Sequence, residues 1–284
     1  MRTEKDSDSK SSVERKKKMK LSISNIGWSE ENDLVVYKMM ENMGFEGIEI
    51  APTRIFPENP YDRLEAAGKW AKEIKRKHRF VVSSMQSIWY GKNNKLFGNE
   101  KERKVLVDYT KKAIDFADAI KCKNLVFGCP RNRNISKGED EAIAIEFFRI
   151  IGKYAAEHNT VVGMEANPPI YNTNYINDTK SALDLIEKVG TDGFKLNLDV
   201  GAMIANEEDV SVLNGREHLI NHVHISEPGL KPIEHRSIHI ALFEMLNING
   251  YDGFISIEVR KQECLENLEK MMKYVGEMFG ETKR

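Results

Sequence analysis

Four segments that look like β-strands end in side chains that bind divalent metal ions. Residues 161–168, 194–201 and 254–259 each carry one carboxylate near their ends, and residues 221–227 carry two imidazoles. The chemistry-bearing residues are Glu165, Asp199, His224 and Glu258. They are separated by 34, 25 and 34 residues, each close to one strand-plus-helix unit of roughly 30 residues. We therefore expect consecutive parallel strands to deliver the four side chains to the same end of a sheet.

Three carboxylates and one imidazole form a ligand set for a hard or borderline divalent ion, such as Mn²⁺, Mg²⁺, Co²⁺ or Zn²⁺. The alternative is that the four are unrelated polar residues at strand ends. Burying unpaired carboxylates together costs several kcal/mol for each charge, so such a cluster needs a compensating cation. We therefore predict one divalent ion bound by all four side chains.

The segments that position these residues alternate between strand and helix patterns along the chain. Strands are expected at residues 20–26, 47–51, 80–88, 124–129, 161–168, 194–201, 221–227 and 254–259. Helices are expected at residues 30–43, 61–77, 100–120, 141–158, 178–189, 207–214, 235–246 and 262–279. Eight such units in about 265 residues predict an α/β protein with a single (β/α)₈ TIM barrel. A doubly wound open sheet is the alternative, but the glycine-rich phosphate loop of a Rossmann fold does not follow the first strand.

The alternation within the strands supports a closed barrel. Ile255 and Ile257 would face the helices, and Ser256 and Glu258 would then face the barrel interior. Barrel interiors are normally filled by branched apolar side chains. A polar interior near the strand ends therefore indicates a functional site.

Composition limits the kinds of partner. The chain has 284 residues and a formal net charge of −1, so it offers no bulk positive field for nucleic acid or an anionic membrane. It lacks an apolar run of about 18 residues that could span a membrane. Its three cysteines show no metal or redox spacing, which predicts a reduced, cytoplasmic protein.

The first residues have a different composition from the rest of the chain. Residues 1–18 are very polar and include the basic run at 15–18, so we expect a disordered tail before a catalytic barrel at residues 19–284. A tether to nucleic acid or a membrane is the less favoured alternative, because short basic runs are usually just solvated.

The motifs together resemble a known family. Residues 165–168 (EANP), 198–201 (LDVG), 222–225 (HVHI) and 250–258 (GYDGFISIE) are similar to the xylose isomerase-like sugar isomerase/epimerase superfamily, over roughly residues 19–280. Its members include D-tagatose 3-epimerase, hydroxypyruvate isomerase, inosose dehydratase and endonuclease IV. The resemblance implies that Glu165, Asp199, His224 and Glu258 are the metal ligands. It also implies that Glu165 and Glu258 are catalytic and exchange protons with a substrate carbon.

The function expected from this resemblance is that of a metal-dependent isomerase or epimerase. Its substrate would be a small sugar, a sugar phosphate or a related polyhydroxy carbonyl compound, converted by proton transfer through an enediolate held by the ion. Two alternatives stay open. One is a dehydratase or lyase that acts on a related keto-polyol at the same site, and the other is a non-catalytic sugar-binding barrel.

Two positions depart from the family pattern. The ketohexose epimerases carry a histidine three residues after the aspartate of the sixth strand, where this chain has Ala202. They carry an arginine six residues after the histidine of the seventh strand, where this chain has Leu230. We therefore expect a substrate that differs from the free ketohexoses in its terminal chemistry. The additional histidines of endonuclease IV have no counterpart, so nucleic acid is not an expected partner.

Several further residues are candidates for substrate contact because they lie at or after the expected strand ends. They are Glu49, Gln86, His222, Arg131, Lys231 and His235. Trp28, Trp89 and Tyr90 could form an aromatic wall beside a sugar. For His222, a position behind the metal ligand His224 or in the core is favoured over direct ligation. For Glu49, a capping or ion-pair role is as expected as substrate contact. The expected partner is a small carbohydrate, and a membrane is not an expected partner. Whether the protein forms homo-oligomers is left open.

Overall fold

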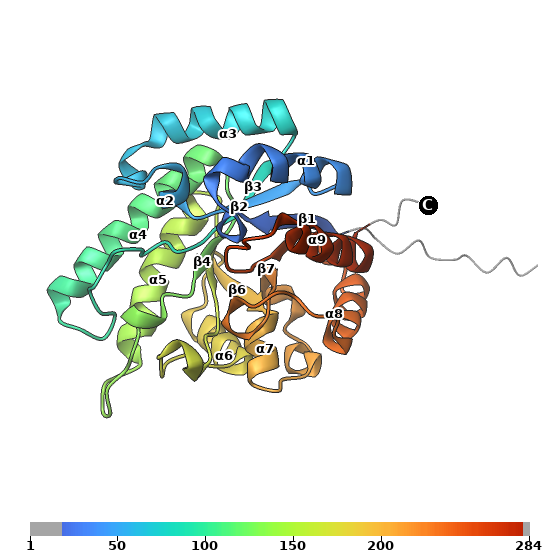
Figure 1. Ribbon diagram of the computed structural model, residues 1–284. Helices are drawn as coiled ribbons and strands as arrows, with labels where there is room; N and C mark the ends of the chain where they lie inside the picture. Colours follow the sequence, from blue (N-terminus) through green and yellow to red (C-terminus); the bar gives the residue numbers. More distant parts are fainter. Residues whose placement is uncertain (1–18, 281–284) are drawn as a thin grey trace, which may run out of the picture.

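The protein folds as a closed barrel of parallel strands surrounded by helices (Figure 1). The structure is a computed structural model that describes residues 19–280. Within these residues, eight strands pair in sequence order and the last pairs with the first, which confirms the predicted single (β/α)₈ TIM barrel. The tail expected at residues 1–18 lies outside the described residues.

The strands are short and the intervening helices are longer, as is usual for this architecture. The strands are β1 (Lys20–Ser24), β2 (Gly47–Ile50), β3 (Val81–Met85), β4 (Leu125–Phe127), β5 (Val162–Met164), β6 (Phe194–Asp199), β7 (Ile220–Ile225) and β8 (Phe254–Ile257). The helices are α1 (Asp33–Met43), α2 (Pro52–Ile55), α3 (Leu64–His78), α4 (Glu100–Ile120), α5 (Ala142–Glu157), α6 (Thr179–Val189), α7 (Val200–Ala205), α8 (Ser237–Ile248) and α9 (Leu265–Phe279).

The barrel interior is polar. Side-chain hydrogen bonds cross the interior between strands that are not adjacent in the barrel, such as the 2.6 Å contact between Ser22 Oγ of β1 and Ser83 Oγ of β3. Asn124 Nδ2 donates to both Ser84 Oγ and Asn197 Oδ1, at 2.9 and 3.1 Å. These mutual bonds satisfy polar groups that would otherwise be costly to bury. They agree with the strand alternation predicted from the sequence.

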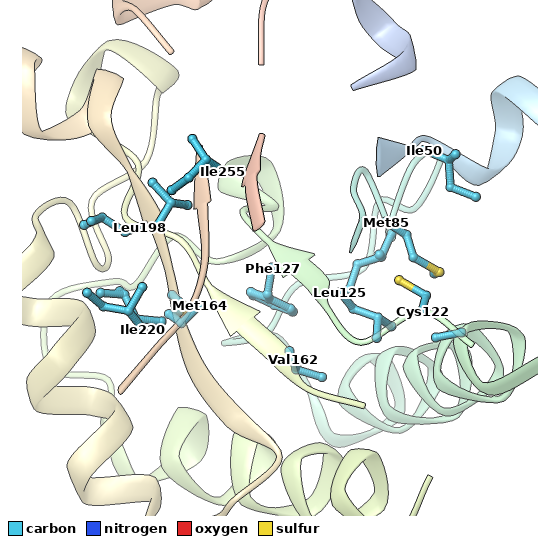
Figure 2. Close-up of a cluster of buried hydrophobic side chains, with 14 of the residues drawn as sticks. Ile50, Met85, Cys122, Leu125, Phe127, Val162, Met164, Leu198, Ile220 and Ile255 are labelled. Carbon is cyan, nitrogen blue, oxygen red and sulfur yellow. The ribbon is translucent and has the colours of Figure 1, made fainter. Parts of the chain in front are cut away.

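The apolar side chains of the same strands form the layer between the barrel and the helices (Figure 2). Leu125 and Phe127 of β4 alternate with inward-facing positions, as do Val162 and Met164 of β5. All four are completely buried. The β4–β5 register places Leu125 beside Val162 and Phe127 beside Met164, so the layer continues from strand to strand.

The connection after β6 differs from the prediction. A helix was expected at residues 207–214, but the helix α7 starts directly after β6, and only a 3₁₀ turn, Val210–Leu213, follows. Asp199 caps α7 by accepting a hydrogen bond from the Ala202 backbone N–H at 2.6 Å, which starts the helix early. In residues 19–280, no helix is both long and apolar enough to cross a membrane.

Candidate metal centre and substrate cavity

The structure brings Glu165, Asp199, His224 and Glu258 together at the carboxyl ends of β5 to β8. Each side chain offers one ligand atom, and these atoms all lie within 4.8 Å of one another. His224 Nδ1 lies 3.1 Å from both Glu165 Oε1 and Glu258 Oε2, and 3.9 Å from Asp199 Oδ2. The spacing predicted from the sequence therefore corresponds to a real cluster.

His224 is held from behind by Glu49. The Nε2 atom of His224 lies 2.9 Å from Glu49 Oε2, and His222 Nε2 lies 3.1 Å from the same oxygen. A carboxylate can only accept, so each imidazole donates its Nε2–H to Glu49. In the neutral ring of His224 the lone pair is then on Nδ1, which faces the carboxylates. This is the arrangement that a metal ligand needs.

Asp199 is fixed through both of its oxygens. Oδ1 accepts from the Ala202 backbone N–H, and Oδ2 accepts from Ser226 Oγ at 2.6 Å. Ser226 Oγ in turn accepts from the Gly201 backbone N–H at 2.9 Å. The carboxylate therefore keeps a single orientation at the end of β6, with Oδ2 toward the cluster.

Glu165 is oriented by two asparagines. Asn197 Nδ2 donates to Oε1 at 3.0 Å, and Asn167 Nδ2 donates to Oε2 at 3.1 Å. Arg133 fixes Asn167 in turn, because its guanidinium donates to Asn167 Oδ1 and to the Glu165 backbone carbonyl, both at 3.0 Å. Arg133 is completely buried, and burial lowers its pKa to about 10, so it remains charged at neutral pH.

Three carboxylates and one imidazole are buried close together in the cluster, and this proximity shifts their pKa values. Burial, together with the charges of Glu165 and Glu258, raises the pKa of Asp199 to about 8. Burial also raises the pKa of Glu258. For His224, burial alone would lower the pKa, but Glu49 and Glu258 outweigh it and raise the pKa well above its usual value. Without a cation, the side chains of the cluster therefore tend to retain protons, which reduce the repulsion between the carboxylates. A bound cation would reduce the same repulsion.

The donor set fits a divalent ion. Ligand atoms about 2.1 Å from an ion lie about 3 Å apart when they are adjacent and about 4 Å apart when they are opposite. The 3.1 and 3.9 Å separations around His224 Nδ1 match these values. Mixed carboxylate and imidazole ligands are suitable for Mn²⁺, Co²⁺, Zn²⁺ or Mg²⁺. Glu165, Asp199, His224 and Glu258 are therefore the residues that would hold the metal.

A cavity of about 180 Å³ opens directly above the cluster. Glu165, Asp199 and Glu258 line it, together with Tyr171 and Leu230. Burial and the charges of the carboxylates raise the pKa of Tyr171 to about 12, so its hydroxyl stays neutral. Its oxygen accepts from the Gly229 backbone N–H at 3.0 Å, which leaves the hydroxyl proton available to a ligand.

A second cavity of about 510 Å³ adjoins the first. The two share the wall formed by Ser87, Cys129 and Pro130, in the loops that follow β3 and β4. Ser87 and Cys129 have left-handed backbone conformations, with φ of 55° and 46°. Such strained positions for non-glycine residues are concentrated at functional sites. We call the first the inner cavity and the second the outer cavity.

The residues predicted to contact substrate fall into three groups. Gln86 lines the inner cavity and Arg131 lines the outer cavity. Glu49 and His222 are buried beneath His224 and, within the described chain, line neither cavity; Glu49 contacts Nε2 of both histidines. Lys231 and His235 are exposed and, in residues 19–280, also line neither cavity.

The positions of these last two residues follow from the loop after β7. His235 stacks on Tyr274, with ring centroids 3.9 Å apart, and Leu230, the residue before Lys231, reaches the inner cavity. The aromatic side chains divide in the same way. Trp89 and Tyr90 line the outer cavity, whereas Trp28 is buried and donates from Nε1 to Asp33 Oδ1 at 2.8 Å.

Sequence reasoning missed the residues that orient the ligands from loops and neighbouring strands. They are Arg133, Asn167, Asn197 and Ser226. It also missed Tyr171, which lines the inner cavity. The only available signal was strand alternation, which places Asn167 two residues after Glu165 and Asn197 two residues before Asp199, on the same strand faces.

Comparison with protein families agrees with this fold and site. The family model described as Xylose isomerase-like TIM barrel matches residues 38–278. The chain therefore belongs to the xylose isomerase-like TIM barrel family. A comparison with curated proteins finds no significant match.

Solved structures with the same fold include several epimerases. The 3-keto-D-glucoside 4-epimerase from E. coli is 21% identical, with a TM-score of 0.72 over 91% of this chain and 99% of that one. The D-psicose 3-epimerase from Clostridium cellulolyticum is 16% identical, with a TM-score of 0.73 over 90% and 96% of the two chains. A probable 3-DHS dehydratase from Bacillus anthracis is 16% identical, with a TM-score of 0.62 over 90% and 98%. At these identities the likeness shows the fold alone.

Proposed function

We propose that the protein is a divalent-metal-dependent isomerase or epimerase of a small polyhydroxy carbonyl compound. The single observation that carries this proposal is the pair of glutamates, Glu165 and Glu258, which face each other across His224 Nδ1 and line the inner cavity. The epimerases described above share this fold, so the fold is compatible with this class of reaction.

The glutamates have the roles of base and acid. One carboxylate removes the proton from the carbon next to the substrate carbonyl, which leaves an enediolate. In epimerisation the other glutamate, as its carboxyl group, returns a proton to the opposite face of the same carbon. In isomerisation a proton returns to the former carbonyl carbon, and the hydroxyl proton moves to the former carbonyl oxygen. A divalent ion held by the four ligands would polarise the carbonyl and make the adjacent C–H more acidic. Asn167 and Asn197 keep Glu165 in position during both steps.

The two glutamates distinguish epimerisation from isomerisation. Inversion at one carbon needs a proton donor and acceptor on each face of the substrate, so neither glutamate is dispensable. Aldose–ketose isomerisation through a cis-enediol uses one face, so replacing one glutamate then has a smaller effect. Glu165→Gln and Glu258→Gln keep the shape and one ligating oxygen but cannot accept a proton.

The experiment is a solvent-deuterium screen of the Mn²⁺-loaded protein with sugars, sugar phosphates and inososes. We expect deuterium at the carbon beside the carbonyl, and a rate loss of about 10²–10⁴-fold in at least one of the two glutamine variants. Mass analysis of the products also reveals loss of water, the outcome that a dehydratase would give. Turnover near the wild-type rate in both variants would rule out proton transfer by these glutamates.

A further inference from the structure

The outer cavity is larger than the inner cavity that lies above the metal centre. The inner cavity of about 180 Å³ corresponds to about six water molecules at about 30 Å³ each, which is room for a small molecule or a fragment. The outer cavity of about 510 Å³ is within the range of whole ligand pockets, about 300–1,000 Å³. The two share a wall, so a substrate held at the metal centre can extend into the outer cavity.

The two cavities have opposite charge. Three carboxylates line the inner cavity. Among the described residues that line the outer cavity, the charged ones are Lys92 and Arg131, and none is acidic. The Lys95 ammonium adds a third positive charge close by, because Nζ donates to the Arg131 backbone carbonyl at 2.6 Å.

The loops that carry Lys92 and Arg131 are tied to each other. Asn132 Nδ2 donates to the backbone carbonyls of Lys92 and Asn94, at 2.9 and 2.8 Å. The Leu96 backbone N–H donates to the Asn132 carbonyl at 2.7 Å. The Lys92 ammonium rests on the Tyr109 ring, 3.9 Å from its centroid. The two loops that carry Lys92 and Arg131 are therefore joined to each other.

We propose that the outer cavity binds an acidic substituent, a phosphate or a carboxylate, on the far end of the substrate. This inference rests on the proposed function, because it names the class of substrate that the same site takes. Lys92 and Arg131 pair with the acidic group, and Arg131 can do so with two parallel N–H donors. The three carboxylates of the inner cavity outweigh the charge of one divalent ion, so the acidic group is favoured in the outer cavity and the substrate enters with its carbonyl end toward the metal centre. Leu230 offers no charge to a terminal group inside the inner cavity, which is consistent with recognition further out.

The test uses polyols that lack a carbonyl and cannot react. Calorimetric titrations compare D-sorbitol, D-sorbitol 6-phosphate and D-gluconate, each with Mn²⁺-loaded and with metal-free protein. The variants are Lys92→Gln, Arg131→Gln and the double variant. Lys104→Gln is the matched control, because it removes one positive charge from the exposed face of α4, where Lys104 pairs with Asp108 outside both cavities.

We expect at least one of the acidic polyols to bind about tenfold or more tightly than D-sorbitol, and the double variant to lose this preference. The acidic polyol that binds more tightly identifies the substituent. The Lys104→Gln variant should keep the preference for the acidic polyol. Equal binding of all three polyols, or a preference that survives in the double variant, would overturn the inference. These probes do not turn over, so the titration does not depend on the reaction. If the deuterium screen shows no exchange but the protein still prefers the acidic polyols, the result counts against the proposed reaction and not against the acid-binding cavity.

Discussion

The Nε2 atom of His224 lies 2.9 Å from a carboxylate oxygen of Glu49, and neither side chain is exposed to solvent. Burial would raise the pKa of Glu49, but His224 and His222 lower it below its ordinary value, so Glu49 is ionised. An ionised acceptor on Nε2 directs the Nδ1 lone pair of His224 toward the other three ligand residues. This contact connects the barrel interior at β2 with the proposed metal centre at β7.

Replacing Glu49 with Gln tests that connection. The amide keeps the shape of the carboxylate but carries no charge and can donate to an imidazole nitrogen, so it no longer selects one tautomer of His224. We expect Mn²⁺ affinity to fall by about 10–100-fold, as is typical when a group that orients a ligand residue is changed. Glu46→Gln, at the exposed residue before β2, is the control. Unchanged Mn²⁺ affinity in Glu49→Gln would show that Glu49 does not orient His224.

Gly128→Ala tests the position of the Glu165 carboxylate without changing any of the four proposed metal-binding residues. A Cβ atom at Gly128 would lie 2.8 Å from Glu165 Oε2 and 3.3 Å from Asn167 Oδ1, so the Glu165 carboxylate must move. The displaced atom is the end of a side chain, so we expect folding to be kept while deuterium exchange falls about tenfold or more, because small misplacements of reacting groups are costly. Gly276→Ala is the control, since its nearest neighbour is Leu21 Cδ1 at 3.9 Å. Full exchange activity in Gly128→Ala would contradict the assigned position of Glu165.

Arg133 and Arg131 look alike in the sequence and differ in the fold. Arg133→Met removes the donors to Asn167 Oδ1 and to the carbonyls of Glu165 and Ile176, which remain buried. We expect the free energy of unfolding to fall by about 3 kcal/mol or more. Arg131→Gln, at an exposed position, should change it by less than about 0.5 kcal/mol. Urea unfolding measures both, and equal effects would contradict the structural role of Arg133.

His239 predicts a pH dependence that does not involve the metal centre. It is completely buried, its Nε2 finds no hydrogen-bond partner among residues 19–280, and burial lowers its pKa to about 4. The unfolded chain, with a histidine pKa of about 6.5, binds more protons between pH 4 and 6.5, so the free energy of unfolding rises with pH in that window. We expect the contribution to reach roughly 3 kcal/mol above pH 6.5 and to be lost as the pH falls toward 4. The stability difference between wild type and His239→Gln, measured in EDTA, should follow this curve, and a difference that is constant with pH would contradict it.

The barrel, and the meeting of Glu165, Asp199, His224 and Glu258 at one end of it, could be predicted because both depend on short-range patterns. Alternation within strands places Glu258 inside, and the repeat length places Glu165, Asp199 and His224 at the same barrel end. Loop packing left no such pattern. Arg131 and Arg133 both follow β4 and look equivalent in the sequence, but the 3₁₀ turn Pro130–Asn132 leaves the first exposed and the second completely buried.

The same limit applies to the connection after β6 and to the residues after β7. The helix expected at residues 207–214 is replaced by the 3₁₀ turn Val210–Leu213, because the backbone is left-handed at Glu207 (φ 55°) and extended at Asp209. Lys231 and His235 follow the correct strand, but the loop turns them to the outside and presents Leu230 instead. Which side of a loop faces a cavity depends on contacts between distant segments, and a single sequence does not encode these as a repeat.

The most direct test of the central claim is a calorimetric titration of EDTA-treated protein with Mn²⁺. We compare the wild type with Asp199→Ala and with Asp192→Ala, an exposed aspartate that precedes the same strand. Asp199→Asn, which keeps an oxygen to cap α7, separates loss of the ligand charge from loss of the helix start. The account predicts one ion per chain in the wild type and in Asp192→Ala, and affinity reduced by at least about tenfold in both Asp199 variants. Equal Mn²⁺ binding by all four proteins, or none by the wild type, would contradict it.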